Sequence, residues 1–149
     1  MQAGLRTDEQ EEMDMYDADR VIAVFAGCEM GIDFIRQLKG AGYSIAGIAH
    51  NGRLAKRLEG IGVTPVCRIN TTEPKAWAVP HVPIGRIYVF EQSFALSCRL
   101  LQICRQWTTE PITIVTKRHH PQSIYRLLGA NYVIYTQSDQ VSFLLSDII

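Results

Sequence analysis

The feature that most constrains this chain is a strand–turn–helix–strand pattern between Arg20 and His50. An apolar, β-branched run at residues 21–25 is too short for a helix and is typical of a strand buried on both faces. A turn of small residues follows, then a helical pattern that ends at residues 40–42, which include two glycines. A second apolar run at residues 43–49 completes the unit. We therefore expect two parallel strands joined by a right-handed helical crossover.

The same alternation of strands and helices continues to the end of the chain. Further strands are expected at residues 63–67, 86–90, 112–116 and 132–135. Helices are expected at residues 53–58, 70–77, 93–107, 121–128 and 139–149. Six short strands alternating with helices predict an α/β class domain over residues 20–149. Its sheet should be doubly wound, mainly parallel and Rossmann-like, in the order 3-2-1-4-5-6, with helices on both faces.

The charges divide the chain into two parts. Residues 1–19 hold seven acids against one arginine, which gives a net charge of −6. The whole chain has a net charge of zero, so residues 20–149 carry +6. We expect an acidic, disordered N-terminal arm on a mildly basic domain. The arm either stays solvated or covers a basic face of this chain or of a partner.

Several functional classes are disfavoured by the sequence. There is no signal-peptide pattern and no apolar run near the ~20 residues of a membrane span, so we expect a cytoplasmic protein without membrane insertion. The basic residues are scattered and show no nucleic-acid-binding motif, so nucleic acid is not an expected partner. No pair of cysteines has CxxC spacing, and the adjacent His119 and His120 lack i, i+4 spacing. We therefore expect no metal site.

An enzyme is not expected either. No tyrosine is followed four residues later by lysine, as in short-chain dehydrogenases, and no nucleophile-elbow motif is present. Cys28, at the start of a predicted helix, is a candidate reactive thiol. The adjacent Glu29 disfavours the thiolate, so we do not assign catalysis to this cysteine.

The turn after the first strand is the candidate phosphate-binding element. Its residues are Ala26, Gly27, Cys28, Glu29, Met30 and Gly31. In the G-x-G-x-x-G fingerprint, the second glycine lets the backbone approach the pyrophosphate and the third allows close packing of helix on sheet. If Gly31 is the third glycine, Ala26 replaces the first and Cys28 the second.

A shifted register remains open for the same turn. Gly27 is then the first glycine, Glu29 replaces the second and Ile32 the third. In both registers Glu29 places a negative charge at a helix N-terminus that would otherwise attract phosphate. Gly31 is expected to be structural in either case.

The residues after the second strand are candidates for the adenosine end of a nucleotide. Ala49 and His50 occupy the place where an acid would hold the ribose hydroxyls, and neither is acidic. His50, Asn51 and Arg53 remain, and Arg53 is suited to a ribose 2′-phosphate or to stacking on adenine. The alternative is that Arg53 belongs to the solvated face of a surface helix. Arg118, after the fifth strand, either contacts phosphate or adenine or lies in an exposed loop.

Several segments together resemble one known family. They are the glycine turn at 26–31, the helix end at 42–43, Arg-Ile-Asn-Thr at 68–71, the strand and basic pair at 115–118, and Leu-Leu-Gly-Ala-Asn-Tyr-Val-Ile at 127–134. In this combination the domain resembles the N-terminal domain of the potassium-conductance regulators, the RCK, KTN or TrkA-N family. The family's Gly-Asp-Ala-Thr element is altered here, because Ile stands in place of its Asp.

The resemblance implies a regulatory function. It implies binding of NAD(H) or of ATP, ADP or AMP, and action on a potassium channel or transporter encoded as a separate membrane chain. It also implies a homodimer or higher oligomer formed through the late helices. The apolar ending at residues 141–149 either forms that interface or packs on the chain's own sheet. The alternative function is a degenerate module that has lost its nucleotide and serves in protein–protein interaction or oligomerisation.

Overall fold

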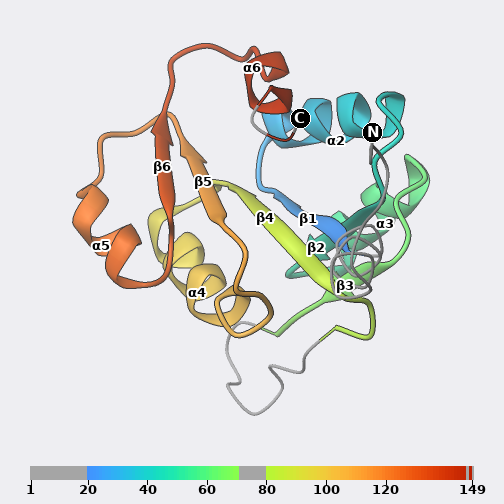
Figure 1. Cartoon of the computed structure of the whole chain (residues 1–149), viewed down its shortest axis with the longest axis horizontal. Coiled ribbons are helices and arrows are strands. Elements are labelled where there is room, and N and C mark those ends of the chain that lie inside the picture. Colours follow the sequence, from blue (N-terminus) through green and yellow to red (C-terminus); the bar gives the residue numbers. More distant parts are fainter. Residues whose placement is uncertain (1–19, 71–79, 147, 149) are drawn as a thin grey trace, which may run out of the picture.

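A single parallel sheet forms the centre of the molecule. The computed structural model describes residues 20–70, 80–146 and 148. Its strands are β1 (Val21–Ala26), β2 (Ile45–Ala49), β3 (Val66–Arg68), β4 (Ile84–Phe90), β5 (Ile112–Thr116) and β6 (Tyr132–Tyr135). Every neighbouring pair is parallel, in the order β3-β2-β1-β4-β5-β6 (Figure 1). The predicted fold class and strand order are confirmed.

Helices cover both faces of this sheet, as predicted. They are α2 (Glu29–Gly40), α3 (Gly52–Gly60), α4 (Phe94–Cys104), α5 (Gln122–Leu127) and α6 (Ser142–Leu145). The helices α2, α3 and α6 contribute to one apolar core, and α4 and α5 to the other. Figure 1 shows α6 lying beside α2, and the two helices are in contact.

The β1 side chains alternate between the two cores. Ile22, Val24 and Ala26 face the α2 side, whereas Ala23 and Phe25 face the α4 side. A strand buried on both faces explains why the sequence reads as a continuous apolar run instead of alternating with polar residues.

Helix ends lie where the local sequence provides caps. The side chains of Asn51 and Ser93 accept hydrogen bonds from the first turns of α3 and α4. Gly42 and Gly62 follow α2 and α3 with φ of +88° and +86°, a backbone conformation that favours glycine.

Two glycines allow β1, α2 and β4 to approach closely. A Cβ on Gly27 would lie 2.2 Å from the carbonyl oxygen of Phe90, to which the Gly27 N–H donates a hydrogen bond of 3.1 Å. A Cβ on Gly31 would lie 2.7 Å from Ala26 Cα and 3.0 Å from the Phe90 ring. The distances of 2.2 Å and 2.7 Å are too short for a real side chain. The expected structural function of Gly31 is therefore explained by its packing.

The C-terminal region differs from the prediction of a helix over residues 139–149. The helix α6 has only four residues, Ser142–Leu145. Before it, the Thr136 hydroxyl accepts from the Ser138 N–H at 3.1 Å, and the Ser138 hydroxyl accepts from the Gln140 N–H at 3.1 Å. These local side-chain hydrogen bonds compete with helix formation.

Other boundaries shift by a few residues. The third strand begins at Val66, because Pro65 lacks an N–H to pair with a neighbouring strand. The helix α4 ends at Cys104, before the predicted residue 107. Most of the helix expected at residues 70–77, and the acidic arm at 1–19, lie outside the described residues.

Among residues 20–70 and 80–146, no helix has both the length and the apolar character needed to cross a membrane.

We predict that Gly31→Ala destabilises the fold by roughly 1–3 kcal/mol, because the added methyl group overpacks the contact with Ala26 and Phe90. Gly40→Ala is the matched control in the same helix, since nothing lies within 4 Å of its added Cβ. It should leave stability unchanged or raise it by up to ~1 kcal/mol. Urea unfolding measures both, and equal effects at the two positions would contradict the close-packing argument.

Candidate functional site

A polar cavity lies at the carboxyl ends of β1, β4 and β5. Its volume is about 390 Å³. It is lined by Gly27, Cys28, Glu29, Met30, Glu91, Gln92, Val115, Lys117, Arg118 and Asp139. The strand order reverses between β1 and β4, and this switch point is where open α/β sheets bind ligands.

The structure brings together only part of the predicted site. Gly27, Cys28, Glu29 and Met30 line the same cavity as Arg118, although β5 is far from this turn in sequence. Two other residues of the turn lie behind the cavity wall: Ala26 is 4% exposed, and Gly31 packs against it.

The other predicted residues, His50, Asn51 and Arg53, follow β2 and do not line the cavity. His50 packs edge-on against Phe25, with the ring centres 5.5 Å apart. Burial lowers the pKa of His50, which favours the neutral ring. The Asn51 side-chain oxygen accepts from the Leu54 N–H at 2.8 Å, so this residue caps α3. Arg53 is exposed on the same helix.

Glu29 forms a two-pronged ion pair with Arg57 of α3. The Oε1 atom lies 2.6 Å from Nη1, and Oε2 accepts from Nη2 at 2.7 Å. This hydrogen bonding holds the pKa of Glu29 below its usual value. The carboxylate thus stays charged beside the first turn of α2, where a bound phosphate would otherwise complement the helix dipole.

Cys28 is exposed at the N-cap of α2 and makes no side-chain capping hydrogen bond. Its side chain stands where the fingerprint places the second glycine in the register that keeps Gly31. The close contact of Gly31 with Ala26 supports that register over the shifted one.

Glu91, directly after β4, is a cavity residue that the sequence analysis missed. Its side chain is only 5% exposed. It accepts a hydrogen bond from the Tyr125 hydroxyl at 2.5 Å and another from the Thr116 hydroxyl, and His120 Nε2 lies 3.1 Å away. Burial and the adjacent carboxylate raise the pKa of Tyr125. The position of Glu91 directly after a buried strand was the signal that would have identified it.

Gln92, Lys117 and Asp139 were also absent from the predicted site. Lys117 forms an ion pair with Asp139, which reaches the cavity from the loop after β6. The hydrogen bond to this carboxylate raises the pKa of Lys117. The neighbouring Arg118 adds a second positive charge to the cavity wall.

The three cavity acids do not converge on a common point suited to a cation. Glu29 binds Arg57, Asp139 binds Lys117, and Glu91 binds hydroxyl groups. Within the described ranges, no group of three or more His, Cys, Asp or Glu residues is placed to hold a metal ion. The chemistry of the wall at Lys117 and Arg118 is instead suited to an anion.

Comparison with solved structures identifies the fold. The RCK-containing GsuK channel bound to NAD matches with a TM-score of 0.64 and 24% identity over 79% of this chain, which spans only 22% of that chain. The NAD(P)-binding domain of an exopolyphosphatase-related protein from Archaeoglobus fulgidus matches with a TM-score of 0.64 and 13% identity. That match covers 87% of this chain and 93% of the other.

The TrkA-N domain of the inner membrane protein ybaL from Escherichia coli gives a third match. Its TM-score is 0.63 at 12% identity, covering 89% of this chain and 99% of that domain. No protein-family model matches the sequence, and no curated protein matches it. The chain therefore has the fold of the RCK and TrkA-N Rossmann-like domains.

We predict that Arg57→Gln raises the pKa of Glu29 toward its ordinary value, because the mutation removes the charged hydrogen-bond donor. A carboxylate with a lowered folded-state pKa contributes stability that is present above the unfolded-state pKa and lost as the pH falls through the folded-state pKa. Titration of the Glu29 side-chain carboxyl carbon by NMR measures the shift. Arg53→Gln, on the same helix, is the control and should leave the titration unchanged.

Proposed function

We propose that this chain is a regulatory adenine-nucleotide-binding domain of RCK/TrkA-N type and not an enzyme. The observation that carries the proposal is the cavity at the β1/β4 switch point, with Lys117 and Arg118 on one wall and the Gly27 turn on the other. Its volume of about 390 Å³ lies in the range of small-molecule sites. The GsuK channel structures bound to NAD and to ADP have the same fold and support this ligand class.

A pyrophosphate on the N-terminus of α2, as in a typical dinucleotide site, does not fit the residues present. The Cys28 side chain stands where backbone would approach the phosphates, and the Glu29 carboxylate would repel them. We therefore infer that phosphates bind at the Lys117 and Arg118 wall, and that a mononucleotide such as AMP or ADP, or ATP, is favoured over NAD(H).

In this proposal, the Glu29–Arg57 ion pair links nucleotide binding to a change of conformation. It joins the first turn of α2, which lines the cavity, to α3, which does not. A bound phosphate that repels Glu29 or attracts Arg57 would favour conformations in which this pair is open. Such differential contacts shift a conformational equilibrium. We propose that the shift is transmitted in the cytoplasm to a potassium channel or transporter that is a separate chain.

The second candidate function is an interaction module without a nucleotide. The Glu29–Arg57 ion pair favours this second function. The Glu29 carboxylate already lies at the N-terminus of α2, where a phosphate would bind, and Arg57 neutralises it. Large apolar side chains are also exposed on the late elements: Ile124, Leu127, Tyr132 and Phe143. Such a surface is suited to homodimer formation or to a protein partner.

We predict that AMP, ADP or ATP, at about 1 mM, raises the unfolding temperature. A ligand of micromolar affinity that binds only the native state adds ~4 kcal/mol, which corresponds to several degrees in a domain of this size. Arg118→Ala should abolish the shift, because it removes the proposed phosphate contact. NAD⁺, NADH and NADPH are tested alongside, and the mononucleotides should give the larger shifts.

Lys56→Ala is the control for this experiment, since Lys56 is exposed on α3 and does not line the cavity. It should retain the full shift. Loss of the shift in Arg53→Ala would place the adenosine end beside α3. If no nucleotide stabilises the protein, the nucleotide function is wrong and the interaction module becomes the better proposal.

We predict that Phe143→Asp converts a homodimer into a monomer without unfolding it. Phe143 is 44% exposed on α6, whereas its neighbours Val141 and Leu144 are buried in the chain's own core. The substitution therefore places a charge at the proposed interface and spares the core. Sedimentation measures the mass and circular dichroism the fold. An unchanged mass would contradict the interface, and Leu144→Ala provides the comparison for a core defect.

A further inference from the structure

A second cavity lies on the sheet face formed by β4, β5 and β6, away from the carboxyl ends. Its volume is about 410 Å³. Strand register places Tyr88, Thr113 and Tyr132 in one row across the three strands. Tyr88 and Thr113 are buried at the floor, and Tyr132 is 57% exposed at the edge strand. We call this cavity the β4–β6 groove.

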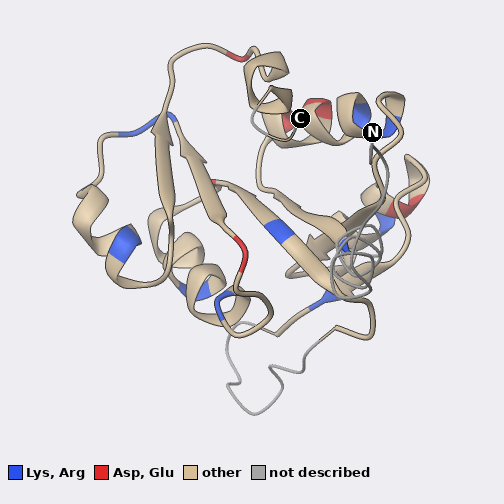
Figure 2. Ribbon diagram, in the orientation of Figure 1, with Lys and Arg blue, Asp and Glu red and all other residues tan. Residues whose placement is uncertain are grey.

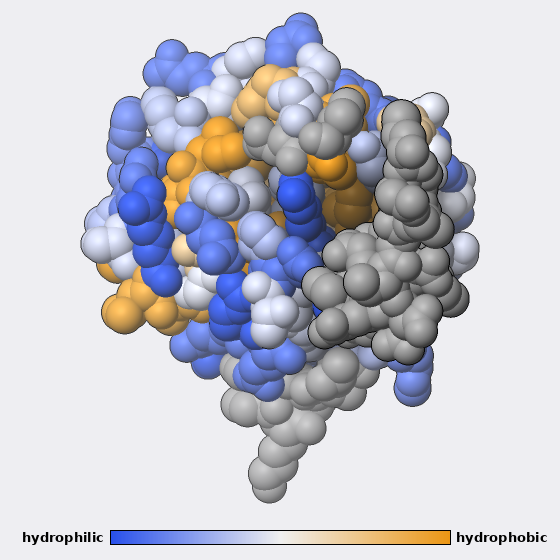
Figure 3. All heavy atoms as spheres, viewed as in Figure 1, coloured by the Kyte–Doolittle hydropathy of each residue, from blue (hydrophilic) through white to orange (hydrophobic). Residues whose placement is uncertain are grey.

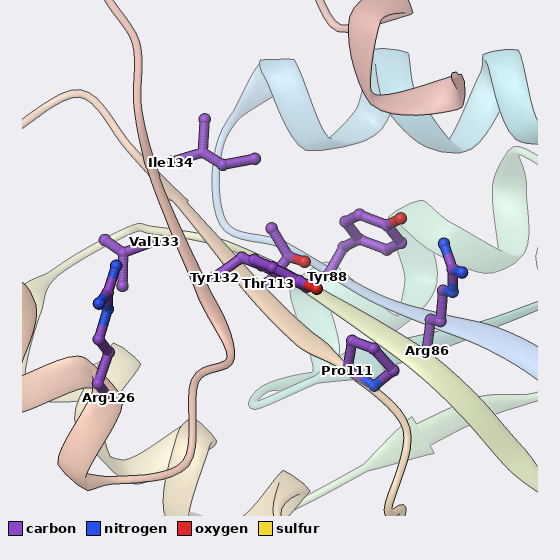
Figure 4. Close-up of a pocket in the computed structure, with 8 residues that line it drawn as sticks. All are labelled: Arg86, Tyr88, Pro111, Thr113, Arg126, Tyr132, Val133 and Ile134. Atoms are coloured by element: carbon purple, nitrogen blue, oxygen red, sulfur yellow. The ribbon is translucent and has the colours of Figure 1, made fainter. Parts of the chain in front are cut away.

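An arginine stands at each side of the β4–β6 groove. Arg86 comes from β4, and Arg126 from α5, beyond the edge of β6 (Figure 4). Figure 2 likewise shows basic positions on β4 and on α5, on either side of β5 and β6. Between them Pro111, Val133 and Ile134 provide apolar lining. Figure 3 shows the mixed character of this side of the molecule, with strongly hydrophilic residues beside apolar ones.

Within the described part of the chain, no residue of α2, α3 or α6 lines the β4–β6 groove. Parallel sheets normally have both faces covered, because both faces are apolar. In this molecule α2 and α3 pack on β1, β2 and β3, and α6 packs on α2. The helix α2 also reaches β4, where the centres of the Phe34 and Tyr88 rings lie 4.8 Å apart, whereas β5 and β6 beyond it form the open part of this face. The lining of the groove is therefore suited to an occupant that combines apolar groups with negative charge.

The chain supplies such a segment, and the residue to which it is joined lies beside the groove. Arg20, the first described residue, lines an adjoining cavity that shares Arg86 with the groove. Residues 1–19, which precede it, carry a net charge of −6. Residues 12–19 have the sequence Glu-Met-Asp-Met-Tyr-Asp-Ala-Asp, which places acidic side chains among methionine and tyrosine side chains.

The segment is also long enough to reach across the groove. From β1 to β6 there are three interstrand spacings, about 15 Å in total. Eight residues of extended chain span up to about 26–29 Å. Because the segment is tethered at Arg20, its effective concentration at the groove is in the millimolar range, so even a weak contact is populated.

We propose that the β4–β6 groove binds the chain's own acidic N-terminal segment, residues 1–19. Its acids pair with Arg86 and Arg126, and its apolar side chains cover the floor at Tyr88 and Thr113. The groove is thus an intramolecular docking surface for an acidic, methionine-containing peptide. The proposal is independent of nucleotide binding, because the groove and the carboxyl-end cavity share no lining residue.

Photo-crosslinking in the full chain tests this proposal. A benzophenone amino acid replaces Tyr16, and mass spectrometry maps the products. We expect crosslinks within one chain to peptides that contain Tyr88, Thr113 or Tyr132. Raising the salt to about 0.5 M should lower their yield, because the contact is electrostatic. Crosslinks to other surfaces of the body, or scattered over it, would overturn the proposal. Crosslinks between chains would overturn binding within one chain and would show that the groove binds the N-terminal segment of a second copy.

Charge reversal provides the specificity control. Arg86→Glu with Arg126→Glu should reduce the crosslink yield about fivefold or more, since both proposed pairs become repulsive. Arg36→Glu with Lys56→Glu changes the net charge equally outside the groove and should leave the yield nearly unchanged. Adding Asp14→Lys and Asp17→Lys to the groove variant should restore crosslinking. Failure of that rescue, with the fold intact by circular dichroism, would contradict the proposed pairing.

Discussion

The close approach of β1, α2 and β4 is the constraint on which the rest of the structure depends. Gly27 and Gly31 leave no space for side chains against Phe90 and Ala26. Their contacts fix the direction in which α2 leaves β1 and bring the end of β4 beside the turn. The switch point between β1 and β4 forms there, and the cavity residues of the turn and of the end of β4 take their positions from this junction.

In the turn at residues 26–31, the residues needed for folding differ from those that would govern ligand binding. The glycines that permit packing are present, whereas Cys28 stands in place of the glycine that permits approach of a pyrophosphate. Glu29 adds a negative charge that Arg57 holds in place. The molecule can therefore keep a dinucleotide-binding fold while its chemistry favours an anion at another part of the cavity, near Lys117 and Arg118. The two glycines of this turn determine the packing, whereas the side chains of Cys28 and Glu29 determine which ligand can approach.

Two surfaces of the described domain each place a pair of basic residues in a setting of different chemistry. At the carboxyl edge, Lys117 and Arg118 lie among acids and hydroxyl groups in a polar cavity. On the sheet face, Arg86 and Arg126 flank a groove with Tyr88 and Thr113 at its floor and apolar lining from Pro111, Val133 and Ile134. The first is suited to a small, highly charged ligand, and the second to a peptide with both acidic and apolar side chains. Although its net charge is zero, the chain thus contains two separate surfaces with paired basic residues and one strongly acidic segment.

The sequence alone determined the α/β class, the strand order and the start of α4 at Ser93, because hydrophobic period, caps and turn glycines act over a few residues. It also predicted residues of the turn and Arg118 as candidates for one site, and Gly27 to Met30 and Arg118 line one cavity. Only the tertiary structure decided which side chains meet. Arg57 binds Glu29 across 28 residues, and Tyr125 binds Glu91 across 34. Such pairs depend on how crossovers align the strands, which local sequence does not encode.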